Sequence, residues 1–176
     1  WQRNLGYVPQ HIFILDDTVA ANIGFGSSTT IDAAKVRRAA ALANIDRFVE
    51  TLPGQYDYVV GEHGSLLSGG QRQRLGIARS LYHDAEVLVL DEATSALDTI
   101  TEREILITLN DLKRDKTIIM IAHRLATIKS ADQVIFIKDG TLAAAGTYDE
   151  LMQSNEECRA FIAAGTEEHT MPADRE

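Results

Sequence analysis

The sequence predicts an α/β fold whose core is a sheet of parallel strands. Two apolar runs, Val87–Leu90 and Thr117–Ala122, are rich in β-branched residues, which is typical of strands buried on both faces. Between them, from about Thr99 to Lys113, apolar residues recur at helical spacing. A strand, a helix and a second strand in this order favour a parallel pair joined by a crossover helix.

The composition is that of an ordinary globular domain. The chain has 176 residues, of which 45% are hydrophobic and 24% are charged. Its formal net charge of −9 makes unaided nucleic-acid binding a poor prediction, because that binding depends on clustered positive charge. The single cysteine, Cys158, excludes an internal disulfide. No apolar run approaches the roughly 18 residues that a membrane-spanning helix needs.

The first part of the chain predicts one strand followed by a small helical lobe. Leu5–Val8 is an apolar run that Pro9 stops, so we expect it to form the strand. Residues with short polar side chains then stand where helix N-caps are expected. The first predicted helix is capped by Asp17–Thr18 and ends at Ile23. The second is capped by Asp32 and covers about Ala33 to Ala43, and the third is capped by Asp46 and stops at Pro53–Gly54.

The later part predicts helices and a hairpin around the two core strands. A helix from about Gly69 to Tyr82 has apolar residues on one face. Asp139-Gly140 is a strong hairpin-turn signal between two short strands. Thr147 and Glu150 form a capping box that opens a last helix. The other predicted elements are a short helix at Leu125–Lys129, strands at Gln133–Lys138 and Thr141–Ala145, and a polar end from Gly165.

The strongest motif is Ser68-Gly69-Gly70-Gln71 at the start of a predicted helix. Adjacent glycines let a ligand approach the backbone, and the amides and dipole of a helix start favour an anion such as phosphate. The same residues also fit an ordinary helix start, because Ser68 and Gln71 have the spacing of a capping box. Local evidence leaves both interpretations open.

Asp91 and Glu92 follow the buried run Val87–Leu90 directly. Carboxylates at the end of such a strand lie at the sheet edge where α/β folds bind ligands. Asp91 could hold Mg²⁺, and Glu92 could polarise an attacking water. The alternative is a solvated acidic loop that caps the next helix.

Two single residues complete the pattern. His123 follows the strand Thr117–Ala122, and Gln10 follows Val8-Pro9. Each alone has an ordinary structural explanation. Taken in order with the Ser68–Gln71 turn and the Asp91-Glu92 pair, however, all can lie around one phosphate-binding edge. The other histidines lack metal-ligand spacing, so no zinc site is predicted.

From about Arg3 to Leu151 the sequence resembles the nucleotide-binding domain of exporter-type ATP-binding cassette (ABC) transporters. Leu67–Gln71 matches the family signature without a substitution, and Val87–Glu92 matches the Walker B strand with its catalytic carboxylate. The remaining matches are Ser95–Asp98 to the D-loop, His123 to the switch histidine, Gln10 to the Q-loop and Val60–Gly64 to the loop before the signature, with Tyr58 in place of the usual Thr.

The resemblance implies a function and a set of roles. Two such domains would pair head to tail on two ATP molecules and drive export by a transmembrane domain, at the cytoplasmic face of a membrane. Glu92 would be the general base and His123 would contact the γ-phosphate. Asp91 and Gln10 would hold Mg²⁺. The other nucleotide-binding positions would be Ser68, Gly69, Gly70, Gln71 and Asp98, the last also bridging the dimer.

The resemblance implies a P-loop NTPase-like core with a small helical subdomain, from which the upstream strands and P-loop are missing. The P-loop pattern ends in Gly-Lys followed by Ser or Thr, and no Gly-Lys pair occurs in the sequence. The chain also begins with Trp1 and not with Met. We therefore expect a carboxyl-terminal portion of the domain that neither binds Mg-ATP tightly nor hydrolyses it alone, and that folds marginally.

The expected division has four parts. Residues 1–15 would end an upstream core strand and form the Q-loop, 16–81 the helical signature subdomain, 82–165 a RecA-like α/β portion with the hairpin and last helix, and 166–176 a polar tail. Two alternatives to a transport ATPase stay open. One is a non-hydrolysing fragment that lends a signature face to a partner. The other is a soluble ABC-type ATPase of DNA maintenance, disfavoured because no heptad run separates Gln10 from Ser68.

Overall fold

The computed structural model describes residues 4–27, 30–93, 97–122 and 124–167. Contacts divide the chain into two compact units, Trp1–Ile121 and Ala122–Glu176, and each is described by itself. A membrane crossing needs a longer and more apolar helix than any that the described residues form.

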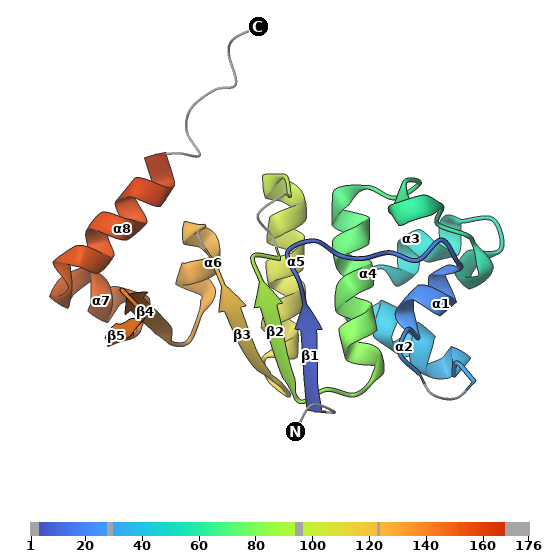
Figure 1. The fold of residues 1–176 in the computed structure, drawn as a ribbon, viewed down its shortest axis with the longest axis horizontal. Coiled ribbons are helices and arrows are strands. Elements are labelled where there is room, and N and C mark those ends of the chain that lie inside the picture. The colour runs from blue at the N-terminus through green and yellow to red at the C-terminus, as the bar shows by residue number, and fades with distance from the viewer. Residues whose placement is uncertain (1–3, 28–29, 94–96, 123, 168–176) are drawn as a thin grey trace, which may run out of the picture. The chain divides into compact units, whose positions relative to one another are not determined.

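The first unit contains a three-stranded parallel sheet in the order β1-β2-β3. Its strands are β1 (Leu5–Val8), β2 (Val87–Asp91) and β3 (Thr117–Ile121), which point the same way in Figure 1. The strand ends therefore meet at one edge, where Leu90 lies between Val8 and Met120. The predicted α/β fold with a parallel core is confirmed.

Only one face of this sheet is well covered in the described part of the unit. Leu88 and Leu90 of β2 are buried and belong to a core that includes residues of the flanking helices. The opposite face is apolar but open: Tyr7, Ile119 and Ile121 are 54%, 52% and 51% exposed. The expectation that β2 and β3 are buried on both faces is therefore wrong for this chain. An apolar run indicates that burial of the strand is favourable. How far its side chains are buried depends on which helices and strands pack against it.

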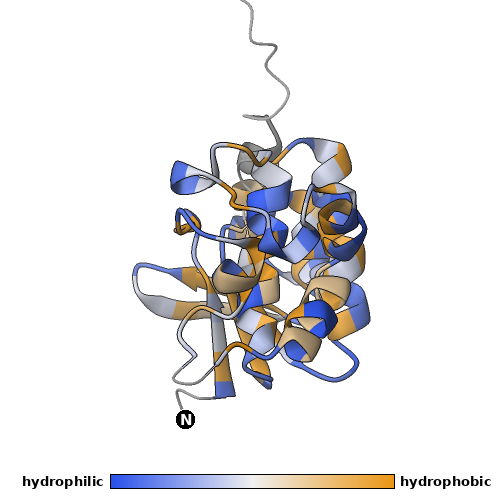
Figure 2. Cartoon of the chain, turned by 90° about the vertical axis from the view of Figure 1, so that its right-hand side faces the viewer, coloured by the Kyte–Doolittle hydropathy of each residue, from blue (hydrophilic) through white to orange (hydrophobic). Residues whose placement is uncertain are grey.

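The helical part of the first unit packs against α4 (Gly69–Tyr82), which lies beside α1 (Val19–Ile23), α2 (Ala33–Leu42) and α3 (Asp46–Thr51) in Figure 1. The same part has short 3₁₀ turns at Gln55–Asp57 and Glu62–Gly64. Figure 2 faces these helices and shows that they carry both apolar and polar residues, as amphipathic helices do.

Local capping explains where these helices begin. The Thr18 hydroxyl accepts from the N–H of Ala21 at 3.0 Å, and the Asp32 carboxylate accepts from Ala34 at 2.8 Å, as predicted. The third predicted cap is wrong. Asp46 is the first residue of α3, and the N-cap is Ile45, which makes no side-chain capping bond. Asp46 still lies in the first turn, where its negative charge interacts favourably with the positive end of the helix dipole.

Helix α5 (Thr99–Leu112) follows β2 and begins at the N-cap Asp98. Its predicted inward residues Ile105, Leu109 and Leu112 are all buried. The Leu75, Ala78, Leu81 and Tyr82 face of α4 is buried as well. The helical periodicity of the sequence therefore identified the buried faces of both helices correctly.

The second unit contains α6 (Leu125–Ser130), the hairpin of β4 (Val134–Lys138) and β5 (Thr141–Gly146), and α7 (Tyr148–Ser154) and α8 (Glu156–Glu167). At the hairpin turn, Asp139 and Gly140 both have the positive φ that a two-residue turn demands. The Thr147–Glu150 capping box is also present. The single last helix is a wrong prediction, because Asn155 leaves the helical conformation and its Oδ1 accepts from the N–H of Cys158.

Candidate functional site

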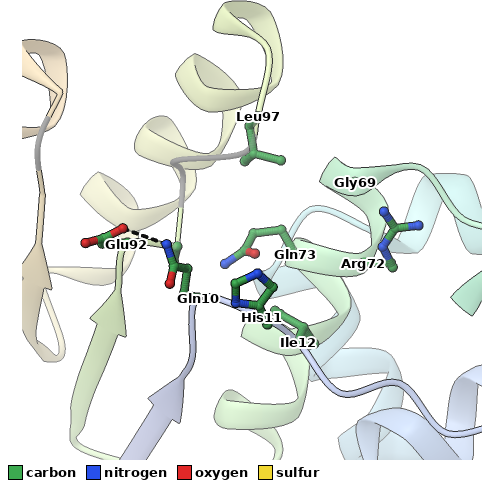
Figure 3. Close-up of a pocket in the computed structure, with 9 residues that line it drawn as sticks. Gln10, His11, Ile12, Gly69, Arg72, Gln73, Glu92 and Leu97 are labelled. Atoms are coloured by element: carbon green, nitrogen blue, oxygen red, sulfur yellow. Dashed lines mark hydrogen bonds between the residues drawn. The ribbon is translucent and has the colours of Figure 1, made fainter. Parts of the chain in front are cut away.

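The carboxyl ends of β1 and β2 bring together two predicted site residues. The side-chain Nε2 of Gln10 donates to a carboxylate oxygen of Glu92 at 2.7 Å (Figure 3). Glu92 has a φ of 46°, so the chain turns sharply as it leaves β2. Its N–H donates to the carbonyl of Ile121 at the end of β3. The sheet edge therefore anchors Glu92 from both neighbouring strands.

Asp91 is held separately from Glu92. The hydroxyl of Tyr7 in β1 donates to its Oδ2 at 3.0 Å. This hydrogen bond, with a smaller contribution from burial, raises the pKa of Tyr7 above its ordinary value. Tyr7 was not predicted from the sequence. The register of the structure explains its contact, because Tyr7 lies opposite Val89, and the side chains of Val89 and Asp91 share a face of β2.

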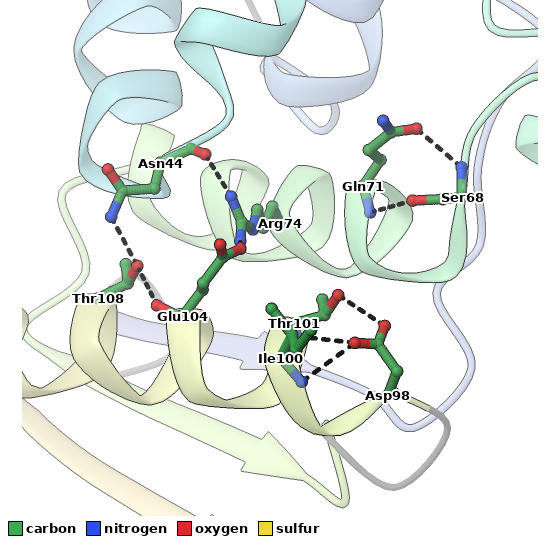
Figure 4. A network of polar contacts seen from close by, with 9 residues as sticks. All are labelled: Asn44, Ser68, Gln71, Arg74, Asp98, Ile100, Thr101, Glu104 and Thr108. Atoms are coloured by element: carbon green, nitrogen blue, oxygen red, sulfur yellow. Dashed lines mark hydrogen bonds and ion pairs between the residues drawn. The ribbon is translucent and has the colours of Figure 1, made fainter.

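The signature turn starts α4 as a complete capping box (Figure 4). The N–H of Ser68 donates to the side chain of Gln71 at 2.8 Å, and the N–H of Gln71 donates to the Ser68 hydroxyl oxygen at 3.2 Å. The two adjacent glycines differ in their surroundings. A Cβ on Gly69 would meet nothing closer than 3.8 Å, whereas one on Gly70 would clash with α5. The turn is thus a capped helix start, one of the two interpretations left open by the sequence. Because Gly69 has no side chain and its surroundings are uncrowded, a ligand can still approach the backbone there.

Asp98 caps α5 (Figure 4). Its carboxylate accepts from the N–H groups of Ile100 and Thr101 and, at 2.7 Å, from the Thr101 hydroxyl. The backbone and hydroxyl hydrogen bonds from Thr101 hold the pKa of Asp98 below its ordinary value. His123, and Ser95 and Ala96 of the predicted D-loop, lie outside the described residues.

A cavity of about 190 Å³ lies between the start of α4 and the ends of β1 and β2 (Figure 3). It brings together three predicted residues, Gln10, Gly69 and Glu92. Ser68, Gly70, Gln71, Asp91 and Asp98 are not part of its lining. Leu97, which belongs to the predicted D-loop Ser95–Asp98, lines the cavity as well. The remaining lining residues, His11, Ile12, Arg72, Gln73 and Ala93, were not predicted from the sequence. Gln73 had a signal, because it lies four residues after Gly69 on the same helix face.

The donor set fits a magnesium ion that keeps most of its water. Carboxylate and amide oxygens are the ligands that Mg²⁺ prefers, and it usually takes only one or two carboxylates plus phosphate oxygens. Asp91 and Gln10 could supply such ligands at the sheet edge. Across the residues that the structure describes, no three His, Cys, Asp or Glu side chains cluster as a closed metal cage would require.

Comparisons with known proteins agree on one family. The family model for ABC transporters matches residues 1–95. The ATP-dependent lipid A-core flippase of Pseudomonas putida is 46% identical over 167 residues, which cover 95% of this chain and 28% of that protein. The flippase of the same name from Bordetella pertussis is 47% identical over 154 residues, covering 88% of this chain and 25% of the relative.

A solved structure gives the same picture. It is a bacterial Atm1-family ABC exporter with ATP bound, which is 38% identical with a TM-score of 0.80. The match covers 99% of this chain and 30% of the exporter chain. The chain thus spans about a quarter of the length of the curated relatives it matches. With half of its residues under the family model and close relatives along nearly all of its length, the chain belongs to the ABC transporter family.

Proposed function

We propose that this chain is part of the ATP-binding and ATP-hydrolysing domain of an ABC exporter. The observation that carries the proposal is the hydrogen bond between Gln10 and Glu92 beside a cavity that Gly69 also lines. It places a carboxylate, an amide and the open start of α4 around one space. Relatives named as ATP-dependent flippases and a structural neighbour solved with ATP support the same activity.

In this proposal the chain's residues position and polarise and form no covalent bond to the substrate. Glu92 accepts a proton from the attacking water, while Gln10 holds the carboxylate in place. Ser68, Gly69, Gly70 and Gln71 face the γ-phosphate held by the P-loop of a second nucleotide-binding domain. Asp91 and Gln10 would hold Mg²⁺, which supplies positive charge for the phosphates when bound.

The remaining roles are proposed on the motif matches. His123 would contact the γ-phosphate, and Asp98 would approach the partner domain while capping α5. Residues 16–81 would form the helical signature subdomain, and 82–165 the core portion. The partners would be a second nucleotide-binding domain and a transmembrane domain, so the chain would work at the cytoplasmic face of a membrane. Because the relatives are named as lipid A-core flippases, an amphipathic glycolipid is the first substrate to test.

The test is Glu92→Gln in the full-length transporter that contains this chain. ATP binding should remain, and turnover should fall by about 100-fold or more, the usual loss when a general base is removed. Glu104→Gln is the matched control, because Glu104 is an exposed glutamate that pairs with Arg74 and does not line the cavity. Unchanged turnover in the Glu92 variant would exclude Glu92 as the base.

A second candidate is a non-hydrolysing chain that only lends its signature face to a partner. The observation that favours it is the lack of any Gly-Lys pair in the sequence. Mixing the chain with a domain that carries a P-loop separates the two functions. Stimulated hydrolysis that survives Glu92→Gln but is lost on changing Ser68 would support the second candidate.

A further inference from the structure

Gln73 is a buried polar residue whose amide lacks a partner. It lies in the second turn of α4 and is only 6% exposed. In the described part of the chain, its Nε2 has no hydrogen-bond partner. An unpaired buried donor loses its hydrogen bonds to water on folding without replacement, so such groups are rare and call for an explanation. No contact within α4 supplies one.

The cavity supplies the explanation. Figure 3 shows the Gln73 amide pointing from α4 into the cavity, on the side where Gln10 and Glu92 lie. His11 and Arg72 also line the cavity, and His11 lies beside Gln73 in Figure 3, whereas Ile12, Ala93 and Leu97 give the lining apolar surface. The volume of about 190 Å³ has room for several waters, each of which occupies about 30 Å³ in the liquid. A water there would find a donor on one wall and a carboxylate on the other.

We propose that Gln73 is a positioning residue for Glu92. Its Nε2 donates to a water in the cavity, and this water donates to the Glu92 carboxylate. The proposal rests on the proposed function, because it assigns Gln73 a part in the same hydrolytic site. It extends that function by naming a residue on α4 that acts on the general base.

The consequence is a further anchor for Glu92, in addition to those from the sheet. The sheet holds Glu92 through the Gln10 amide after β1 and the carbonyl of Ile121 in β3. The anchor through Gln73 comes instead from the helix that begins with the signature turn Ser68–Gln71. A displacement of α4 would therefore change the placement of the base, which links the signature turn to hydrolysis within one chain.

Gln73→Met in the full-length transporter tests this role. Methionine keeps an unbranched side chain of similar size but removes both amide donors. We expect kcat for ATP to fall by about 10-fold or more, with KM changed less than about twofold, because the loss affects the base and not ATP binding. The melting temperature should not fall, since the variant removes an unsatisfied buried group.

Thr108→Val is the matched control for a buried polar residue with a structural role. Thr108 is 2% exposed, and its hydroxyl is paired with Asn44 and with the carbonyl of Glu104. This variant should lower the melting temperature and leave kcat unchanged. Unchanged kcat in Gln73→Met, or a loss of kcat together with a loss of stability like that of Thr108→Val, would overturn the proposal.

Two further readouts separate the possible failures. If the wild-type transporter hydrolyses ATP and Glu92→Gln abolishes turnover, a normal Gln73→Met refutes the role of Gln73 alone. If Glu92→Gln keeps full turnover, the proposed function fails and the role of Gln73 fails with it. A high-resolution structure of the transporter should show a water within hydrogen-bond distance of Gln73 Nε2 and Glu92. A direct protein partner for Nε2 in that structure would contradict the proposal.

Discussion

A Cβ atom on Gly70 would lie 2.3 Å from Cγ2 of Thr101, so the first turns of α4 and α5 meet at a distance that only glycine permits. Gly70→Ala should therefore lower the free energy of unfolding by about 1–3 kcal/mol, the usual cost of overpacking. Urea denaturation measures the change.

Gly69→Ala is the control for this substitution. A Cβ there would meet its nearest heavy atom, Cδ2 of Leu97, at 3.8 Å, which is ordinary contact. Both variants gain similar helix propensity, so the difference between them isolates the clash. Adding Thr101→Ser to Gly70→Ala removes Cγ2 and should restore most of the stability. Equal stability of the two alanine variants would show that α5 moves away from the new Cβ atom without a loss in the free energy of unfolding.

Asn44 combines a left-handed backbone with a side-chain hydrogen bond. Its φ is 53°, and its Nδ2 donates to the Thr108 hydroxyl at 2.8 Å (Figure 4). Asn44→Ala and Asn44→Gly both lose that bond, but only alanine strains the backbone. We expect Asn44→Ala to be less stable than Asn44→Gly by about 1 kcal/mol. Thermal denaturation of both variants is the measurement, and equal melting temperatures would contradict it.

The lowered pKa of Asp98 makes the start of α5 sensitive to acid. The N–H and hydroxyl of Thr101 stabilise the carboxylate in the folded state. This contribution is present at neutral pH and is lost as the pH falls from the ordinary value of 3.8 through the lowered pKa. Thr101→Val removes the hydroxyl bond and keeps the backbone bond, so the pKa of Asp98 should rise toward its ordinary value.

An NMR titration of the side-chain carboxyl carbons follows this change directly. Glu150 is an internal control, because the N–H and hydroxyl of Thr147 lower its pKa in the same way. Its titration should be the same in wild type and in Thr101→Val. An Asp98 pKa that does not move would show that the backbone N–H groups alone account for the shift.

The 176-residue chain by itself should not bind Mg-ATP detectably at millimolar ATP. Backbone amides and a lysine of a P-loop supply most of the grip on the β- and γ-phosphates, and the sequence has no Gly-Lys pair. Isothermal titration calorimetry on a sample of confirmed mass is the measurement. Binding at one site per chain would mean that the residues around Glu92 hold the phosphates themselves.

Prediction from the sequence succeeded where a few neighbouring residues decide the structure. The caps Thr18 and Asp32 and the turn at Asp139-Gly140 were predicted correctly. The capping box at Ser68 and Gln71, one of two interpretations left open for that turn, is present. The failure at Asp46 has a local cause too. The chain enters α3 directly from the preceding turn, so Ile45 takes the N-cap position and Asp46 is already helical.

The candidate site was harder to predict, because its residues meet across long sequence separations. Gln10 and Glu92 were both named from motifs, but their hydrogen bond joins residues 82 positions apart. Tyr7 was missed because a tyrosine in a short strand has no motif of its own. Gln73 was missed because a glutamine in an amphipathic helix reads as a solvent-facing residue, whereas α4 buries it beside the cavity.

By itself, then, the sequence determined most of the helices and strands, the parallel arrangement of the core strands and the family to which the chain belongs. Caps, turns and apolar periodicity act over a few residues, so a single sequence displays them. Only the tertiary structure decided that Gln10 holds Glu92, that the Gln73 amide faces the cavity and that Tyr7, Ile119 and Ile121 on one face of the sheet are about half exposed. Strand register and helix packing set those relationships, and both depend on contacts between segments far apart in the chain.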